Sequence, residues 1–492
     1  MPRPGDPGTR WRRLAIEPRR PERVRTSAAA PWLAVGTVCV GAFMGQLDAS
    51  IVTVALPAIG RDLGAGLGAV EWVVLSYVVV LVGAVALVGR LADSFGRKLL
   101  YTYGFALFAA ASVGCALSPS LAVLIVCRIV QGAGAVMLQA NSVALIREAA
   151  PPGRLGVAIG LQGAAQAVGL AAGPSIGGAL VAAASWRLIF LVNVPVGIAG
   201  LILAWLLLPT SRHRVRSADI SVGGALLLAA IASCFLAALS LAVENGAPAG
   251  AIAATAAAGA VLVPFAIARQ RANGGVIDPG LLATRGFTLG SLATLLAQAA
   301  LFGTLLVVPF FLETARGVAA GAAGLQLSVL PVALAVVAPA GGRLADRVGP
   351  RLPAASGLTA TVAGLALVAA GPASQLLTAG LAIIGAGLGL FIPANNASTI
   401  AAAPSARAGA AGGLLNMARG LGAALGVSAA GLAYGIAAGA TVGTTVHEAA
   451  SNPTAGLRTA VIVLATLAAV ALIPAVARRA PAGTPLTAPL AR

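Results

Sequence analysis

Asp48 and Arg128 are charged residues inside long apolar stretches, and this makes them candidates for chemistry within a membrane. A charge at the centre of a membrane-spanning helix costs roughly 2.5–3.5 kcal/mol on insertion scales, so such residues are functional candidates. Asp48 lies nine residues before Pro57, and Arg128 lies nine residues after Pro119. At about 1.5 Å of rise per residue, both are expected about 13 Å below the same membrane surface. We therefore expect a compensating partner or a water-filled cavity beside each charge.

Proton binding is one function that Asp48 could have. A carboxyl group that is dried and wetted in turn can bind a proton on one side of a membrane and release it on the other. Arg128 would tune that exchange, or pair with Asp48 when a substrate leaves. The alternative is a structural ion pair or a helix-packing contact, and the sequence leaves both open.

Amide side chains and one further arginine also lie in apolar stretches. Gln131 and Gln139 follow Arg128 by three and eleven residues, so these three side chains share a helix face. Such residues could line a substrate cavity. The alternative for each is a hydrogen bond between helices, which contributes about 0.6–2 kcal/mol. The candidate cavity residues are Gln131, Gln139, Gln162, Gln166, Gln298, Asn395, Asn416 and Arg419.

The composition places these residues in a membrane protein. Of 492 residues, 59% are hydrophobic and 9% are charged, and the mean hydropathy is +0.95. A soluble domain carries about 25% charged residues. This excludes a cytosolic enzyme, a secreted disulfide scaffold and a disordered chain. The sequence holds no Walker loop, catalytic triad or metal-ligand motif, so we expect no enzyme activity, no metal and no cofactor.

Apolar runs of about 18 residues or more predict membrane-spanning helices. Fourteen such runs occur, which predicts an all-α membrane protein. They cover residues 32–57, 70–89, 99–118, 120–146, 155–181, 187–208, 219–243, 249–268, 285–312, 322–342, 352–371, 375–401, 407–433 and 457–477.

Arginine and lysine are concentrated in alternate loops. With the N-terminus in the cytoplasm, 26 of the 32 cations lie in cytoplasmic segments and four lie in outer loops. This bias predicts the orientation, and the even number of spans then places both termini in the cytoplasm. It also explains the net charge of +18 without nucleic acid. Lys98 is the only lysine while Ala, Gly and Arg abound, which suits the cytoplasmic membrane of a high-GC bacterium.

A ten-residue motif occurs twice. Residues 89–98 read GRLADSFGRK, and residues 342–351 read GRLADRVGPR. The copies lie eight predicted spans apart, and many transporters consist of two six-helix halves, so two extra helices lie between the halves. The predicted organisation is an Arg-rich cytoplasmic tail (1–31), a six-helix half (32–208), an inserted helix pair (219–268), a second six-helix half (285–477) and a cytoplasmic tail (478–492).

The repeated motif could act as a gate. Its glycines permit close approach of helices, its aspartate can accept hydrogen bonds at a helix start, and its cations can pair with that aspartate. A loop that holds helix ends in one state and releases them in another would control access to a cavity. The alternative is a tight turn that carries a cationic cluster. The candidate gate residues are Gly89, Asp93, Gly96, Arg97, Lys98, Gly342, Asp346 and Arg347.

The sequence GLAAGPSIGG over residues 169–178 places small residues on one helix face. Gly169, Gly173, Gly177 and Gly178 allow another helix to pack closely. Pro174 removes a backbone donor and bends the helix. This segment could be a hinge between the halves that seals the inner side and favours export. Ordinary small-residue packing is the alternative.

These motifs together resemble the major facilitator superfamily, and specifically its fourteen-spanner drug:proton antiporter family. The resemblance covers nearly all of residues 32–478. It rests on the two loop copies and on further segments that occur in the family's order. These are FMGQLDASIVTVALPAI (43–59), RIVQGAGA (128–135), GLAAGPSIGG (169–178), WRLIFLVNVPVG (186–197), AGLQLSVLP (323–331) and NMARGLGAALG (416–426).

The resemblance implies a multidrug or antibiotic-resistance exporter that exchanges protons for hydrophobic substrates, cationic ones included. It assigns proton coupling to the residues that match the family signature, Asp48 and Arg128. It implies a monomer in the lipid bilayer, driven by the proton gradient and without a cofactor. Two alternatives stay open: a proton-coupled importer of a small nutrient on the same fold, and a membrane receptor or scaffold that transports nothing.

Overall fold

A computed structural model describes residue 17, residues 20–151, 154–210, 279–371, 374–403, 408–438 and 452–477, and isolated positions between 224 and 262. Within these residues, twelve helices are long and apolar enough to cross a membrane. All the regular elements of the described segments are helical. The helix pair predicted over 219–268 falls mostly outside the described residues, so fourteen spans stay a prediction.

Twelve of the predicted spans coincide with observed helices. In the first half these are α3 (Ala30–Asp62), α4 (Leu67–Phe95), α5 (Arg97–Ala116), α6 (Leu121–Ala149), α7 (Leu155–Ala183) and the pair α8 (Leu188–Leu191) and α9 (Asn193–Leu207). In the second half they are α13 (Arg285–Phe310) with the π-helical turn η1 (Phe311–Ala315), α14 (Ala320–Val348), α15 (Arg351–Ala370), α16 (Ser374–Ala401), α17 (Ala408–Ala438) and α18 (Pro453–Val476). Short helices α2 (Glu22–Arg25) and α12 (Pro279–Leu282) precede the two halves.

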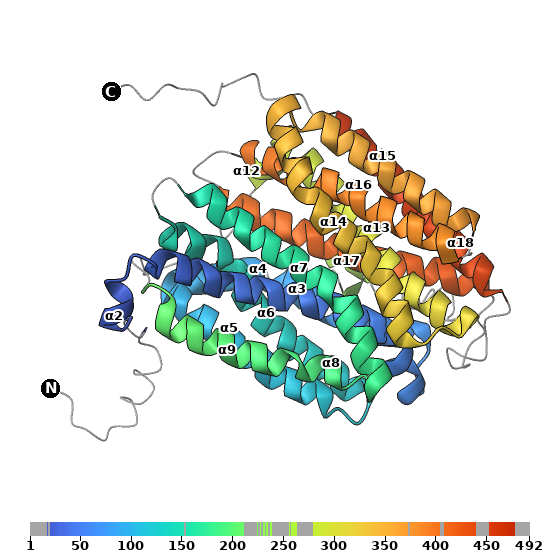
Figure 1. Ribbon diagram of the computed structural model, residues 1–492, viewed down its shortest axis with the longest axis horizontal. Helices are drawn as coiled ribbons and strands as arrows, with labels where there is room; N and C mark the ends of the chain where they lie inside the picture. Colours follow the sequence, from blue (N-terminus) through green and yellow to red (C-terminus); the bar gives the residue numbers. More distant parts are fainter. Residues whose placement is uncertain are drawn as a thin grey trace.

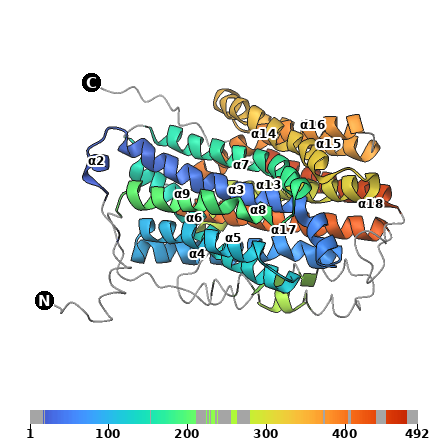
Figure 2. The same ribbon diagram turned by 60° about the horizontal axis from the view of Figure 1, so that its bottom comes forward.

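The two halves lie side by side and meet along a few helices. The helices from α3 to α9 form one group and those from α13 to α18 form the other, as Figures 1 and 2 show. Across the boundary, α7 packs against α14, α4 packs against α17, and α3 contacts α13. We call the end of the bundle that carries the loops 63–66, 117–120, 184–187 and 316–319 the outer end, because the cation bias predicts that it faces away from the cytoplasm.

The glycine-rich segment of α7 packs on both sides. An added Cβ at Gly169 would lie 3.1 Å from the Leu47 nitrogen on α3. At Gly178 an added Cβ would lie 3.1 Å from the Gly324 Cα on α14. Side chains at these positions would separate the helices, so the glycines allow α7 to join its own half to the other.

The repeated motif takes the same form in both halves. Helices α4 and α14 each have 29 residues, and the helices that follow, α5 and α15, each have 20. The turns between them use Gly96 (φ +112°) and Gly349 (φ +83°), in the backbone region that favours glycine. At Gly89, however, no atom of the described residues lies within 4 Å of an added Cβ, so the close packing expected there stays a prediction. At Gly342 the nearest atom is the Pro393 Cβ at 3.9 Å, an ordinary contact.

Candidate functional site

Asp48 and Arg128, which the sequence places at one depth, form an ion pair. The Arg128 Nη1 lies 2.7 Å from the Asp48 Oδ2. The side chains are 0% and 1% exposed. The pair joins α3 to α6 inside the first half. A buried charge pair of this kind is stable only when hydrogen bonds satisfy its remaining donors and acceptors.

Amide side chains supply those hydrogen bonds to Asp48. Its Oδ1 accepts from the Gln131 Nε2 at 3.0 Å and from the Asn193 Nδ2 at 2.9 Å. The Gln131 Oε1 in turn accepts from Arg128 at 2.7 Å, and its amide nitrogen donates to the Ser112 Oγ at 2.8 Å. Helices α3, α6 and α9 therefore meet at one carboxylate, and α5 joins the network through Ser112.

Arg128 is also held from α4. Its Nε donates to the Val73 carbonyl oxygen at 2.8 Å. Its guanidinium carbon lies 4.4 Å from the centre of the Tyr77 ring, a distance typical of a cation–π contact. These contacts do not involve Asp48. The arginine therefore has favourable partners besides Asp48.

Sequence reasoning missed two members of this network, Ser112 and Asn193. Asn193 lies within WRLIFLVNVPVG, two residues before Pro195, and a polar amide in such an apolar run was the available signal. Gln131 was a candidate for the cavity, but it is 0% exposed and belongs to the ion-pair network.

An open cavity lies between the two halves, and its space of about 790 Å³ includes open solvent. Arg128 reaches its wall, so the ion pair adjoins the cavity although Asp48 does not line it. Gln46, which the sequence analysis did not select, also lines it. The candidate cavity residues that do so are Gln139, Gln166, Gln298, Asn416 and Arg419.

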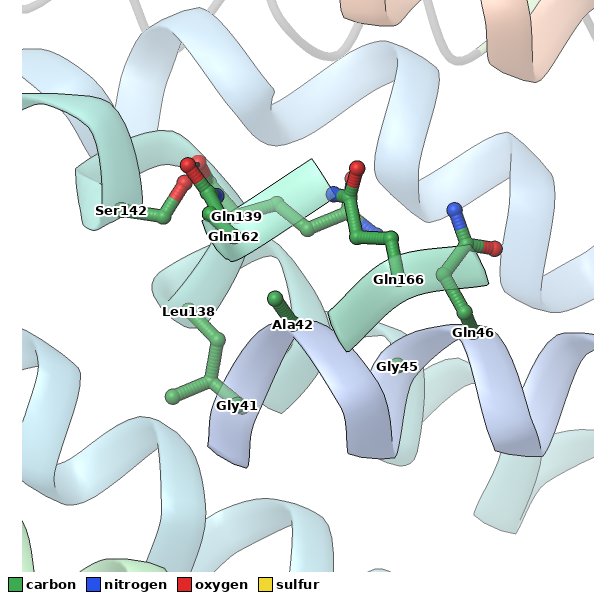
Figure 3. A pocket seen from close by; sticks show the side chains of 9 residues that line it. All are labelled: Gly41, Ala42, Gly45, Gln46, Leu138, Gln139, Ser142, Gln162 and Gln166. Atoms are coloured by element: carbon green, nitrogen blue, oxygen red, sulfur yellow. Dashed lines mark hydrogen bonds between the residues drawn. The ribbon is translucent and has the colours of Figure 1, made fainter. Parts of the chain in front are cut away.

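A smaller open pocket shares part of this wall. Gln46, Gln139 and Gln166 line both spaces, and Gln162 lines the smaller one. Figure 3 shows these four amide side chains gathered over α3. The first half therefore presents a cluster of neutral hydrogen-bonding groups to the cavity.

Asn395 has a different position. Its Nδ2 donates to the Thr294 Oγ1 at 2.7 Å and to the Gly290 carbonyl oxygen at 3.2 Å. It is 1% exposed and lines neither space. Asn395 thus connects α16 to α13, which is the hydrogen-bonding alternative that the sequence had left open.

Among the gate candidates, Arg97 forms an ion pair with a described residue. The Arg97 Nη1 lies 2.7 Å from the Glu148 Oε1 at the end of α6, a partner that the sequence analysis did not name. Lys98 is buried and Arg347 is exposed. The side chains of Asp93 and Asp346 lie outside the described part of the chain. The aspartate contacts expected for the motif therefore stay a prediction.

The halves are closed against each other near the outer end. The Ser175 and Ser328 hydroxyl oxygens lie 2.6 Å apart between α7 and α14. Glu71 on α4 is 0% exposed and lies against Gly431 on α17, where an added Cβ would lie 2.7 Å from its carboxyl carbon. Neither Glu71 oxygen has a hydrogen-bond partner among the described residues. The sequence analysis did not select Glu71.

Two helical halves around a central cavity are typical of a membrane transporter. The sequence matches the family described as Major Facilitator Superfamily over residues 38–427 and 290–491. The chain belongs to this superfamily. It is therefore a multi-pass membrane transporter and not an enzyme.

Several characterised transporters resemble the chain. It is 32% identical over 393 residues to the riboflavin transporter RibZ of Clostridioides difficile (strain 630), covering 79% of this chain and 85% of RibZ. It is 31% identical over 396 residues to the tetracenomycin C resistance and export protein of Streptomyces glaucescens. This match covers 80% of this chain and 74% of that protein. It is 34% identical over 394 residues to the multidrug resistance protein Stp of Mycobacterium tuberculosis (strain CDC 1551 / Oshkosh). This match covers 78% of this chain and 72% of Stp.

A solved structure has the same fold. A bacterial homologue of the human lysosomal transporter Spinster, in an inward-facing and occupied conformation, superposes with a TM-score of 0.67. It is 16% identical and covers 91% of this chain, which covers 97% of it. At this identity, the likeness supports the fold alone.

Proposed function

We propose that the protein is a proton-coupled exporter of hydrophobic drugs or antibiotics across the bacterial cytoplasmic membrane. It acts as a monomer with both termini in the cytoplasm, driven by the proton gradient without a cofactor. Relatives named for tetracenomycin C export and for multidrug resistance support export. The observation that carries proton coupling is the buried Asp48–Arg128 pair beside the cavity.

The coupling step follows from the hydrogen bonds of this pair. A proton on Asp48 removes the charge that attracts Arg128, while Val73 and Tyr77 still hold the guanidinium. The neutral carboxyl then weakens the link between α3 and α6. Return of the carboxylate restores it. Since Arg128 lines the cavity, a change in the charge of Asp48 reaches the cargo space through this arginine.

The energy available suits this exchange. One unit of pH difference contributes about 1.4 kcal/mol per proton. A potential of 100 mV adds about 2.3 kcal/mol for each net charge moved. Together they support a substrate concentration ratio of a few hundredfold per proton, since each 1.4 kcal/mol is about tenfold.

Inverted membrane vesicles that are acidified inside by respiration test the proposal. A pH-sensitive dye reports proton release when riboflavin, tetracenomycin C or ethidium is added. Wild type and Asp62→Asn, a control on the same helix at the outer end, are expected to release protons. Asp48→Asn is expected not to. Release by Asp48→Asn would move the proton site elsewhere. No release by correctly inserted wild type would overturn coupled export of these compounds.

A nutrient importer is the second candidate, because RibZ is named as a riboflavin transporter and matches over 85% of its length. A riboflavin-requiring strain that expresses the chain separates the two directions of transport. Growth at low riboflavin that depends on Asp48 would favour import. Resistance to added drugs without such growth would favour export.

A further inference from the structure

The charge of the cavity is set by Arg419. This arginine lies near the middle of α17 and lines the cavity from the second half. Its Nη1 donates to the Asn416 Oδ1 at 3.0 Å. The structure records no ion pair for Arg419 with any residue it describes. A guanidinium has five N–H donors, so most of its donors have no protein acceptor among those residues.

No acidic residue among the described ones compensates this charge within the cavity. Among the described residues that line it, two are charged, Arg128 and Arg419, and none is Asp or Glu. Arg128 is neutralised by Asp48 behind the wall. Within the described part of the chain, Arg419 is therefore the one charged lining residue without an acidic partner. A cation that entered it would meet a like charge in a low-dielectric space, whereas an anion would find a partner.

The rest of the wall is largely apolar. Val78, Leu81 and Phe302 supply apolar surface, and the Tyr77 ring adjoins them. Gln139 and Gln166 face the cavity from the first half and can donate or accept. A guanidinium binds a carboxylate or an acidic oxygen through two parallel hydrogen bonds, which gives the site a defined anchor.

We propose that Arg419 anchors an acidic group of the cargo, so that the protein selects amphiphilic anions over cations of the same shape. This rests on the proposed function in taking the cavity as the cargo site. It narrows the substrate class implied by the family resemblance, which included cations. Charge selection arises in the second half, while the Asp48 network lies in the first.

Two xanthene dyes with one ring system test the proposal. Fluorescein is an anion at neutral pH and rhodamine 123 is a cation. Binding of each dye to the purified full-length protein is measured by fluorescence anisotropy, which requires no transport. Wild type is expected to bind fluorescein at least about tenfold more tightly. Tighter binding of rhodamine 123, or no binding of fluorescein, would overturn the proposal.

Variants of Arg419 test whether this residue causes the preference for the anionic dye. Arg419→Gln is expected to weaken fluorescein binding about tenfold or more and to leave rhodamine 123 unchanged or better bound. Arg419→Lys should retain part of the preference, since the charge stays. Arg458→Gln, outside the cavity on α18, is the matched control. Unchanged fluorescein binding by folded Arg419→Gln, or by Arg419→Glu if Arg419→Gln does not fold, would overturn the proposal.

Proton release from vesicles separates this inference from the proposed function. If the dyes bind with the expected preference but no compound triggers proton release, coupled export fails while the charge preference stands. If protons are released in response to rhodamine 123 and not fluorescein, export stands and the charge preference fails.

Discussion

Arg61 on α3 and Glu313 on η1 form an ion pair that joins the two halves near the outer end. The Arg61 Nη2 lies 2.9 Å from the Glu313 Oε2. The two side chains differ in burial, since Arg61 is 42% exposed and Glu313 is 3% exposed. Glu313 lies on a π-helical turn, a distortion that often occurs at functional sites.

This difference in burial predicts unequal effects of the two single substitutions. Arg61→Gln leaves a buried carboxylate without its cation, whereas Glu313→Gln leaves a half-exposed arginine in contact with water. We expect Arg61→Gln to open the outer end more than Glu313→Gln does. The measurement is labelling of Ser328→Cys by a charged thiol reagent in a chain without its native cysteines.

The size of the effect and its control follow from the same geometry. Arg61→Gln should raise the labelling rate by a factor of about ten, if about 1.4 kcal/mol of closed-state stability is lost. Arg187→Gln is the control, because it breaks a 2.7 Å pair with Asp62 inside one half. Equal labelling of Arg61→Gln and Arg187→Gln would contradict a role of the Arg61–Glu313 pair in closure.

The contact between Ser175 and Ser328 predicts a reversible lock. Their oxygens lie 2.6 Å apart, so cysteines at both positions can approach the roughly 2.05 Å of a disulfide. Oxidation of Ser175→Cys/Ser328→Cys, in a chain without native cysteines, is expected to stop transport, and a reductant should restore it. The single variants are the controls. Full transport by the cross-linked protein would show that the outer end need not open there.

Gly169 and Gly163 lie on α7 but have different surroundings. An added methyl at Gly169 meets the backbone of α3, which cannot move aside, while nothing lies within 4 Å of an added Cβ at Gly163. Gly169→Ala is expected to lower the free energy of unfolding by about 1–3 kcal/mol. Gly163→Ala should leave it unchanged or raise it by up to about 1 kcal/mol. Thermal unfolding in detergent compares them, and equal midpoints would refute the packing of α7 on α3.

We predict that substitutions at Glu71 and Gly431 compensate each other, because the two residues are in contact. A methyl at Gly431 would lie 2.7 Å from the Glu71 carboxyl carbon, so Gly431→Ala alone should reduce folded yield and transport. Glu71→Ala removes the obstructing carboxyl group, and Glu71→Ala/Gly431→Ala is expected to recover much of both. A double-mutant cycle measures the coupling. Simply additive effects would contradict direct contact between α4 and α17 at this point.

The sequence predicted features that depend on one helix at a time. The matched depth of Asp48 and Arg128 followed from the fixed rise of a helix, and the two side chains do meet. Asn193 was missed because its contact with Asp48 joins residues 145 apart, and helix periodicity does not reveal which helices are neighbours. Gln131 was assigned to the cavity for the same reason: it shares a face with Gln139 but lies at a level where other helices cover it.

Residues at the ends of apolar runs were the least predictable. Glu71 and Glu313 lie where a sequence cannot separate water, lipid headgroups and a neighbouring helix. The surroundings of these two residues depend on how the second half packs against the first, and this packing buries both carboxyl groups. The partner of Arg97 was missed for a similar reason, because Glu148 comes from the end of a different helix.

The equal lengths of α4 and α14 have an evolutionary consequence. The first residues of these helices, Leu67 and Ala320, are 253 positions apart, and so are the turn glycines Gly96 and Gly349. A residue inserted within either helix would rotate all later side chains by about 100° and misalign the faces that pack. An ancestral gene duplication followed by removal of such insertions accounts for the preserved register. Length differences among descendants of that gene are therefore expected in the segments between helices.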